Sequence, residues 1–168
     1  MAKIHLVEGS VGAGKSTFSL KLEEDLKGVH FSVDDWMTAL FRPDRPNTDV
    51  LVWYSHRKKR CIEQILKVAN KVLSSDTDVI LELGLINKDL RKYFLEIIAL
   101  KNHSLEVYVL DAPRDVRKIR VKKRNIEKGK TFSMEVPDNI FEMASDMWEP
   151  VTNEDFRGEK INYISTNG

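Results

Sequence analysis

Short apolar runs alternate along the chain with longer stretches in which apolar residues recur every three or four positions. The longer stretches have the period of an amphipathic helix, and the short runs are typical of strands. The run at residues 78–83 is apolar almost throughout, as expected for a strand that helices cover on both faces. The alternation predicts an α/β domain with a mainly parallel sheet. Its strands are expected at residues 3–8, 30–33, 78–83, 105–110 and 161–164.

Capping residues and helix breakers place the helices between these strands. The first helix is expected to end at Gly28 in a left-handed turn. Two prolines within residues 42–48 predict a loop, and a long helix is expected to follow it over about residues 49–73. Asn87 is a favourable N-cap for the next helix. Because no repeat or linker divides the sequence, a single domain over residues 1–168 is predicted.

Composition and charge exclude several classes of protein. The chain has 168 residues, of which 42% are hydrophobic and 32% charged, as in an ordinary globular domain. A net charge of +1 gives no reason to expect general affinity for nucleic acids or membranes. No apolar run reaches the roughly 18 residues of a membrane span, and the early first strand leaves no room for a signal peptide. A single cysteine, Cys61, suits a reducing compartment, so a cytoplasmic protein is expected.

The strongest chemical signal lies between the first strand and the first helix. Residues 9–16 read Gly-Ser-Val-Gly-Ala-Gly-Lys-Ser and fit the pattern G-x-x-x-x-G-K-[ST] without a mismatch. Such a loop directs backbone N–H groups and the positive end of the helix dipole toward phosphate oxygens. Lys15 is expected to reach the β- and γ-phosphates, and the Ser16 hydroxyl to bind Mg²⁺. The alternative, a glycine-rich turn that binds nothing, is disfavoured by the strand and helix on either side.

ATP with Mg²⁺ is therefore the predicted ligand of this loop. The residues expected to form the phosphate cradle are Gly9, Ser10, Val11, Gly12, Ala13, Gly14, Lys15, Ser16 and Thr17.

Carboxylates at the ends of two strands are further candidates. Asp34 and Asp35 follow the second strand, where a carboxylate could accept the proton of an attacking hydroxyl. An aspartate at this point is equally suited to cap the next helix. Glu82 lies near the end of an apolar strand, where a lone buried carboxylate is costly. A Mg²⁺–water shell beside Lys15 and Ser16 would stabilise Glu82, and pairing with an arginine or an exposed strand end is the open alternative.

Two basic segments have different expected roles. Within residues 114–130, Arg120 and Arg124 lie four positions apart on one helix face, and guanidinium groups suit both base stacking and phosphate contact. A solvated surface helix is the alternative, but beside a phosphate cradle a mobile basic lid over about residues 114–136 is favoured. The cluster at residues 56–60 occupies consecutive helix positions and is expected to be mostly solvated, with one arginine able to reach an anionic substrate.

Taken together, these motifs resemble those of the P-loop kinase group, which includes 5′-hydroxyl polynucleotide kinase, chloramphenicol phosphotransferase, zeta toxins and chains described as AAA-family ATPases. Residues 31–36, Phe-Ser-Val-Asp-Asp-Trp, are similar to the block in which the first aspartate, here Asp34, is the general base. Arg120 falls on the adenine-stacking arginine of adenylate-kinase-like proteins, and Arg124 on their phosphate-contacting lid arginine. The resemblance implies a three-layer P-loop NTPase fold, a sheet in the order 2-3-1-4-5 and phosphoryl transfer from ATP.

Two positions depart from the pattern of this group. Glu82 stands where the group usually has aspartate, and Thr38 stands where polynucleotide kinase has an arginine that contacts the nucleic-acid phosphate. Together with the near-zero net charge, Thr38 disfavours a polynucleotide acceptor. The resemblance does not imply which molecule accepts the phosphate. Residues 36–54 are expected to form the acceptor pocket.

The leading hypothesis is an ATP-dependent kinase that moves the γ-phosphate to a hydroxyl of a small-molecule or nucleotide-like acceptor. Lys15, Mg²⁺, Arg120 and Arg124 would hold and neutralise the triphosphate, and Asp34 would be the general base. One alternative is a kinase that heals 5′-hydroxyl ends of nucleic acid, for which a basic groove would lead to Asp34. The other is a non-catalytic, nucleotide-dependent switch. No membrane partner is expected.

Overall fold

The computed structural model describes residues 1–98 and 103–167. These residues form a five-stranded sheet in which every pairing is parallel and the order is β2-β3-β1-β4-β5, so the implied order is confirmed. The central strand β1 pairs Ile4 with Val79 on one side and with Leu105 on the other. The strands span Ile4–Gly9 (β1), Val29–Ser32 (β2), Val79–Glu82 (β3), Leu105–Asp111 (β4) and Lys160–Ser165 (β5).

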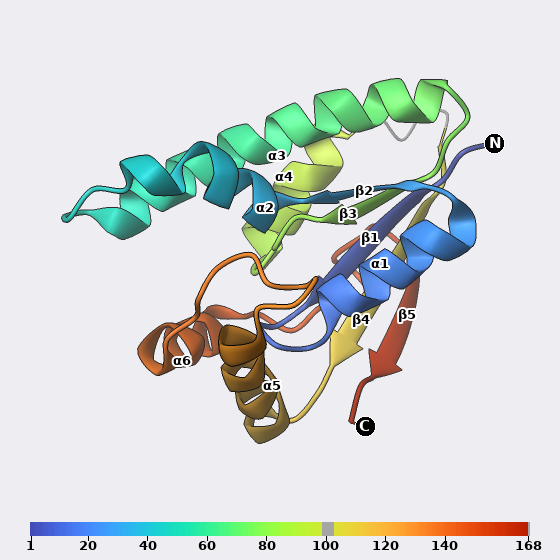
Figure 1. The fold of residues 1–168 in the computed structure, drawn as a ribbon. Helices are drawn as coiled ribbons and strands as arrows, with labels where there is room; N and C mark the ends of the chain where they lie inside the picture. The colour runs from blue at the N-terminus through green and yellow to red at the C-terminus, as the bar shows by residue number, and fades with distance from the viewer. Residues whose placement is uncertain (99–102, 168) are drawn as a thin grey trace.

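Helices cover both faces of the sheet and complete the predicted three layers (Figure 1). Helices α3 and α4 lie over one face and α1 over the other, while α5 and α6 lie together near the carboxyl ends of β1 and β4. The helices span Lys15–Leu26 (α1), Val33–Leu40 (α2), Val50–Ser74 (α3), Lys88–Ile97 (α4), Arg114–Glu127 (α5) and Asp138–Met147 (α6), with a short 3-10 helix at Arg42–Asp44 (η1). Within the described ranges, no helix has both the length and the apolar content that a membrane span requires.

The side chains of the central strand alternate between two hydrophobic cores. Leu6 of β1 belongs to the larger core under α3 and α4, and Val7 belongs to the smaller core under α1. Phe18 and Leu22, four residues apart on α1, pack on the smaller core. The neighbouring strand β3 is buried along its whole length, as its apolar run predicted. Because β1 and β3 are buried on both faces, they give the loops that follow them a fixed starting point.

Two helix ends differ from the sequence prediction. The left-handed residue that ends α1 is Lys27, with φ 52°, and not Gly28. The glycine serves a different purpose, because a Cβ at Gly28 would lie 2.9 Å from the backbone oxygen of Asp78. Helix α2 begins at Val33, and its N-cap is Ser32 and neither aspartate. The prediction for α4 is confirmed, since the side chain of Asn87 accepts a hydrogen bond from its first turn.

Parallel strands bring three sequence-distant segments to one edge of the sheet. The glycine-rich loop follows β1, helix α2 follows β2, and Glu82 is the last residue of β3. Because all three strands run the same way and are neighbours in the order β2-β3-β1, their carboxyl ends meet. This edge carries the candidate site.

Candidate active site

The glycine-rich loop turns sharply between β1 and α1, and α5 lies directly against it. Gly12 and Gly14 have φ values of 79° and 98°, which side chains with a Cβ rarely adopt. A Cβ on Gly12 would also lie 2.7 Å from the backbone oxygen of Arg117. Arg117 in turn donates to the carbonyl oxygen of Val11 at 2.9 Å. The loop is therefore shaped by glycine and held from outside by a buried arginine.

Lys15, the first residue of α1, folds its side chain back into this loop. Its Nζ donates to the carbonyl oxygens of Gly9 at 2.8 Å and Ser10 at 3.1 Å. Burial lowers the pKa of Lys15, while the carboxylates of Glu82 and Asp34 act in the opposite direction. A phosphate anion in the loop would raise that pKa, since it would bring negative charge to a partly desolvated amine. The loop and its lysine thus form a cradle suited to a phosphate.

Glu82 lies between the first turn of α1 and β2. Its Oε2 accepts a hydrogen bond from Ser16 at 3.1 Å, and its Oε1 lies 2.7 Å from Nε2 of His30. Burial by itself would raise the pKa of Glu82, but the hydrogen bond and charge of His30 lower it overall. Among the described residues, the cationic partner of Glu82 is this histidine and not an arginine, and the strand end is buried. The sequence analysis missed His30, which has no motif of its own.

The adjacent oxygens of Ser16 and Glu82 are of the kind that Mg²⁺ prefers. Ser16 Oγ and Glu82 Oε2 lie 3.1 Å apart at the mouth of the phosphate cradle. A hydroxyl and a carboxylate supply part of a magnesium shell, and waters and phosphate oxygens usually supply the rest. These residues fit the ion, and their role as its ligands stays a prediction.

Asp34 and Asp35 occupy the first turn of α2 and have different environments. Asp34 is exposed as a residue, yet protein crowds its carboxyl group, and the lost hydration raises its pKa. The cations Lys58 and Lys15 oppose that shift. Asp35 instead accepts a hydrogen bond from Ser133 at 2.6 Å, from the loop that follows α5. Only Asp34 therefore faces the cations of the cradle.

The basic cluster at residues 56–60 contains a buried member that the sequence analysis missed. Lys58 is 9% exposed, so the prediction of a mostly solvated cluster is wrong at this position. Its Nζ donates to the carbonyl oxygen of Gly84, just beyond β3. Burial lowers the pKa of Lys58, while Asp34 and Glu8 raise it. Helix α3 thus brings a cation to the same edge as the cradle.

Glu8 is a second residue that sequence reasoning did not find. It precedes the glycine-rich loop in β1 and is 1% exposed. Burial raises its pKa to about 8, although Arg91, Lys15 and Lys58 all lower it. Glu8 is thus a buried acid in the strand that leads into the cradle, and its charge is coupled to those of Lys15 and Lys58.

The two predicted arginines of α5 approach the cradle at different points. Arg120 donates to Thr166 at 2.9 Å and to the carbonyl oxygen of Gly12 at 3.4 Å, which places it at the outer edge of the loop. Arg124 lies deeper: burial lowers its pKa, and the carboxylates of Asp34 and Glu82 oppose that shift. Arg124 therefore belongs to the electrostatic cluster of Asp34. Stacking of Arg120 on a base stays a prediction.

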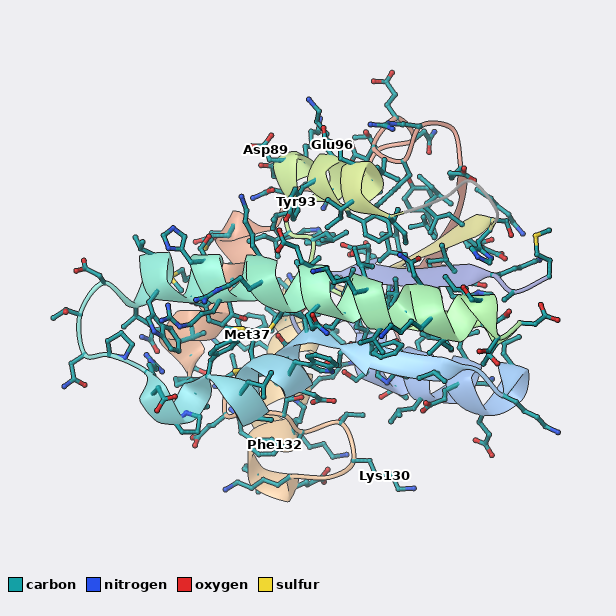
Figure 2. The ribbon with its side chains drawn as sticks, turned by 90° about the horizontal axis from the view of Figure 1, so that it is seen from above. Met37, Asp89, Tyr93, Glu96, Lys130 and Phe132 are labelled. Atoms are coloured by element: carbon teal, nitrogen blue, oxygen red, sulfur yellow. The ribbon has the colours of Figure 1, made fainter. Side chains whose placement is uncertain are left out.

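The rest of the basic segment is braced and is not simply a solvated face. Lys118 lies 2.8 Å from Glu142 of α6, and Lys122 lies 3.3 Å from Asp138. The chain between α5 and α6 then arches toward α2, where Figure 2 places Lys130 and Phe132. Ser133 in this arch makes the contact with Asp35. We call residues 128–136 the arch; through Ser133 it touches the first turn of α2, which carries Asp34.

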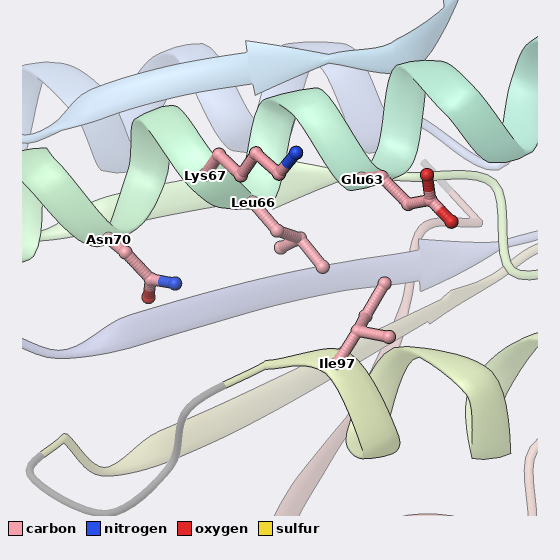
Figure 3. Close-up of a pocket in the computed structure, with 5 residues that line it drawn as sticks. All are labelled: Glu63, Leu66, Lys67, Asn70 and Ile97. Carbon is pink, nitrogen blue, oxygen red and sulfur yellow. The ribbon is translucent and has the colours of Figure 1, made fainter.

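Two cavities lie at different distances from the site. A small one of about 50 Å³ lies beneath the arch, and its lining includes Ser16, His30 and Asp35. A surface pocket of about 340 Å³ lies between α3 and α4 (Figure 3). Its lining residues are Glu63, Leu66, Lys67, Asn70 and Ile97. Since these come only from the helices that cover the sheet, this pocket is separate from the cradle.

Comparison with protein families identifies the group to which the site belongs. Residues 4–149 match the family model described as AAA domain (AAA_33). The chain belongs to this AAA domain family. The matched residues include the cradle, both aspartates of α2 and all of α5. The resemblance to P-loop kinases is thereby confirmed at the level of family and fold.

This AAA domain also shares its fold with solved structures of low sequence identity. A sugar kinase from a Janibacter species superposes with a TM-score of 0.67 at 16% identity, covering 98% of this chain and 86% of that chain. Kti12 of Chaetomium thermophilum, in complex with ADP-AlF3, superposes with a TM-score of 0.69 at 13% sequence identity. The match covers 97% of this chain and 89% of that chain. A chain of the Pnkp1/Rnl/Hen1 RNA repair complex superposes with a TM-score of 0.65 at 18% sequence identity. The match covers 87% of this chain and 43% of that chain. No curated protein matches the sequence.

The different positions of Arg120 and Arg124 lead to a testable contrast. Arg124→Ala is expected to slow phosphoryl transfer by roughly a hundredfold to a thousandfold, because it removes positive charge near the transferred group. Arg120→Ala is expected to weaken nucleotide binding with little change in the rate at saturation, since contacts at the loop edge act equally in ground and transition states. Nucleotide titration and single-turnover kinetics measure the two quantities. Unchanged affinity and rate in both variants would assign α5 a purely structural role.

Proposed function

We propose that this AAA domain is an ATP-dependent kinase that transfers the γ-phosphoryl group of ATP to a hydroxyl group of its acceptor, with Asp34 as the general base. The observation that carries the proposal is the convergence of Asp34, Lys15 and Arg124. They come from α2, the glycine-rich loop and α5, and the charges of Lys15 and Arg124 both act on the Asp34 carboxyl group. A base beside a phosphate cradle is what this reaction needs.

Each residue has a separate task in this reaction. Lys15 and Arg124 would bind oxygens of the transferred group and offset its negative charge. Asp34 would orient the acceptor hydroxyl and take its proton. As the new bond forms between the hydroxyl oxygen and the γ-phosphorus, the bond from that phosphorus to the β–γ bridging oxygen breaks and ADP leaves. Mg²⁺, held through Ser16 and Glu82, would supply further charge neutralisation at the phosphates.

The arch supports a role for the site in transfer as well as in binding. Its contact with Asp35 brings it beside the edge where the acceptor hydroxyl would lie. An arch that closed further over bound substrates would keep water away from the γ-phosphate, where water would otherwise compete with the acceptor. A switch that only binds nucleotide has no need for a base or for this cover.

Incubation with γ-labelled ATP, Mg²⁺ and a panel of hydroxyl compounds tests the proposal. The panel contains sugars, nucleosides, aminoglycoside- and phenicol-type compounds, and 5′-hydroxyl oligonucleotides. The expected result is a labelled phosphate monoester from one class of acceptor, with ADP formed in equal amount. If ATP binds tightly but no compound increases ADP formation or takes up label, the nucleotide-dependent switch becomes the better account.

Lys58 provides a pH-dependent test of the base assignment. The transfer rate should fall as Asp34 becomes protonated, and Lys58 lowers the pKa of that carboxyl against the effect of burial. Lys58→Met removes the positive charge that lowers the pKa of Asp34. The acid limb of the rate profile is therefore expected to move to higher pH. The measurement is kcat/KM for the acceptor between about pH 5 and pH 9. Lys59→Met, an exposed change on the same helix, is the control, and identical profiles for all three proteins would argue against the assignment.

A further inference from the structure

Three arginines gather where α2 meets the start of α3. Phe41 ends α2, and the guanidinium carbons of Arg57 and Arg60 lie 5.9 and 5.8 Å from the centroid of its ring. Arg57 also lies 4.5 Å over the ring of Trp53. Arg42 follows Phe41 directly and donates to the sulfur of Met134 in the arch at 3.3 Å. We call Arg42, Arg57 and Arg60 the arginine cluster.

The arginine cluster makes no ion pair within the described part of the chain. None of the ion pairs among the described residues includes Arg42, Arg57 or Arg60. Some basic residues of α5 do form such pairs, as Lys118 does with Glu142. Aromatic rings hold two of the guanidinium groups in place while leaving their charge available. Such a group of fixed cations attracts an anion.

The arginine cluster lies at the end of α2 opposite to Asp34. Phe41 lies seven positions after Asp34, which corresponds to a rise of about 10 Å along the axis of α2. Tyr54 of α3 lies within electrostatic reach of both Asp34 and Arg42. Burial raises the pKa of Tyr54, the charge of Asp34 raises it further, and the charge of Arg42 lowers it. Both charged groups therefore act on one phenol. The contact of Arg42 with Met134 brings the arch to the arginine cluster as well.

We propose that the arginine cluster binds a phosphate ester group of the acceptor, while Asp34 activates a hydroxyl of the same molecule. The inference rests on the proposed function and adds the chemical class of the substrate. Guanidinium groups make forked hydrogen bonds to phosphate oxygens, and several of them together suit a doubly charged group better than a neutral one. The cradle takes the phosphates of ATP, so the arginine cluster serves a different anion.

Matched acceptors that differ only in a phosphate ester test the substrate class. We would compare ribose with ribose 5-phosphate, glycerol with glycerol 3-phosphate, and both esters with a 5′-hydroxyl oligonucleotide. The expected result is a kcat/KM at least about tenfold higher for the phosphorylated member of a pair, as one charge-assisted contact would give. Preference for the oligonucleotide would identify phosphodiesters as the source of the phosphate. Equal or better use of the uncharged alcohols would overturn the inference.

A binding measurement separates this inference from the proposed function. Calorimetry with ribose 5-phosphate, in the presence of a non-hydrolysable ATP analogue, needs no turnover. The double change R57Q/R60Q is expected to weaken binding by about tenfold or more. Lys59→Gln is the matched control, because Lys59 faces Tyr93 on the α4 side of α3 (Figure 2). Equal affinity in R57Q/R60Q, or no binding of any phosphate ester by the unaltered protein, would overturn the inference even if transfer to another acceptor is found.

Discussion

Lys15→Ala is expected to abolish measurable ATP binding and turnover. The substitution removes the amine that lies inside the glycine-rich loop, 2.8 Å from the carbonyl oxygen of Gly9. The backbone cradle remains, but it loses the charge that would stand opposite the β- and γ-phosphates. We expect the affinity for ATP to fall by roughly a hundredfold or more, since hydrogen bonds between charged groups are the strong ones. Calorimetric titration with ATP and Mg²⁺ measures the loss.

Thermal unfolding distinguishes this effect from damage to the fold. Without nucleotide, the Lys15→Ala variant should unfold close to the temperature of the unaltered protein, because burial already disfavours the charged form of this amine. With ATP, only the unaltered protein should gain stability, since a ligand stabilises the state that binds it. Lys21→Ala, an exposed change on the same helix, should keep the gain. A Lys15→Ala variant that binds and uses ATP normally would refute the cradle.

Asp34→Asn is expected to lower transfer to the acceptor by roughly a hundredfold or more, the usual effect of losing a positioned general base. Asparagine preserves the size of the side chain, and the N-cap of α2 is Ser32, so the helix should form as before. Folding and ATP binding should therefore survive. Single-turnover transfer, measured once an acceptor is known, reports the chemical step directly.

The neighbouring Asp35→Asn change is the matched control for Asp34. The same chemical change is made one residue away, and an amide oxygen can still accept the hydrogen bond from Ser133. Its effect on transfer should be several-fold at most. Equal, small effects at both positions would remove the base from the mechanism and favour the nucleotide-dependent switch.

The phosphate cradle could be predicted because its structure is local. Glycines at fixed spacing, a lysine and a serine between a strand and a helix specify one turn, whatever surrounds it. The strand prediction succeeded for a related reason, since burial on both faces leaves an apolar run in the sequence itself. The order of the strands was not worked out from these patterns but was implied by resemblance, and the structure confirmed it.

Predictions of helix ends from local sequence were wrong where a neighbouring residue ends or caps the helix instead. Gly28 is an obvious helix terminator, yet Lys27 adopts the left-handed turn, and the glycine is favoured by the close approach of the backbone at Asp78. Either aspartate of α2 would be a good cap, yet Ser32 caps the helix. Capping propensities are similar among these residue types, so tertiary contacts of a fraction of a kcal/mol decide between them.

The sequence by itself determined the class of fold, the phosphate cradle and the pair of aspartates from which Asp34 comes, because each depends on residues that are neighbours in the chain. Only the tertiary structure decided that Lys58 is buried at the edge of the sheet and acts on Asp34, that His30 is the partner of Glu82, and that Glu8 is a buried acid coupled to the lysines of the site. These residues belong to separate strands and helices and have no common motif. Their charges act on one another only because parallel strands end at one edge of the sheet, where burial weakens solvent screening.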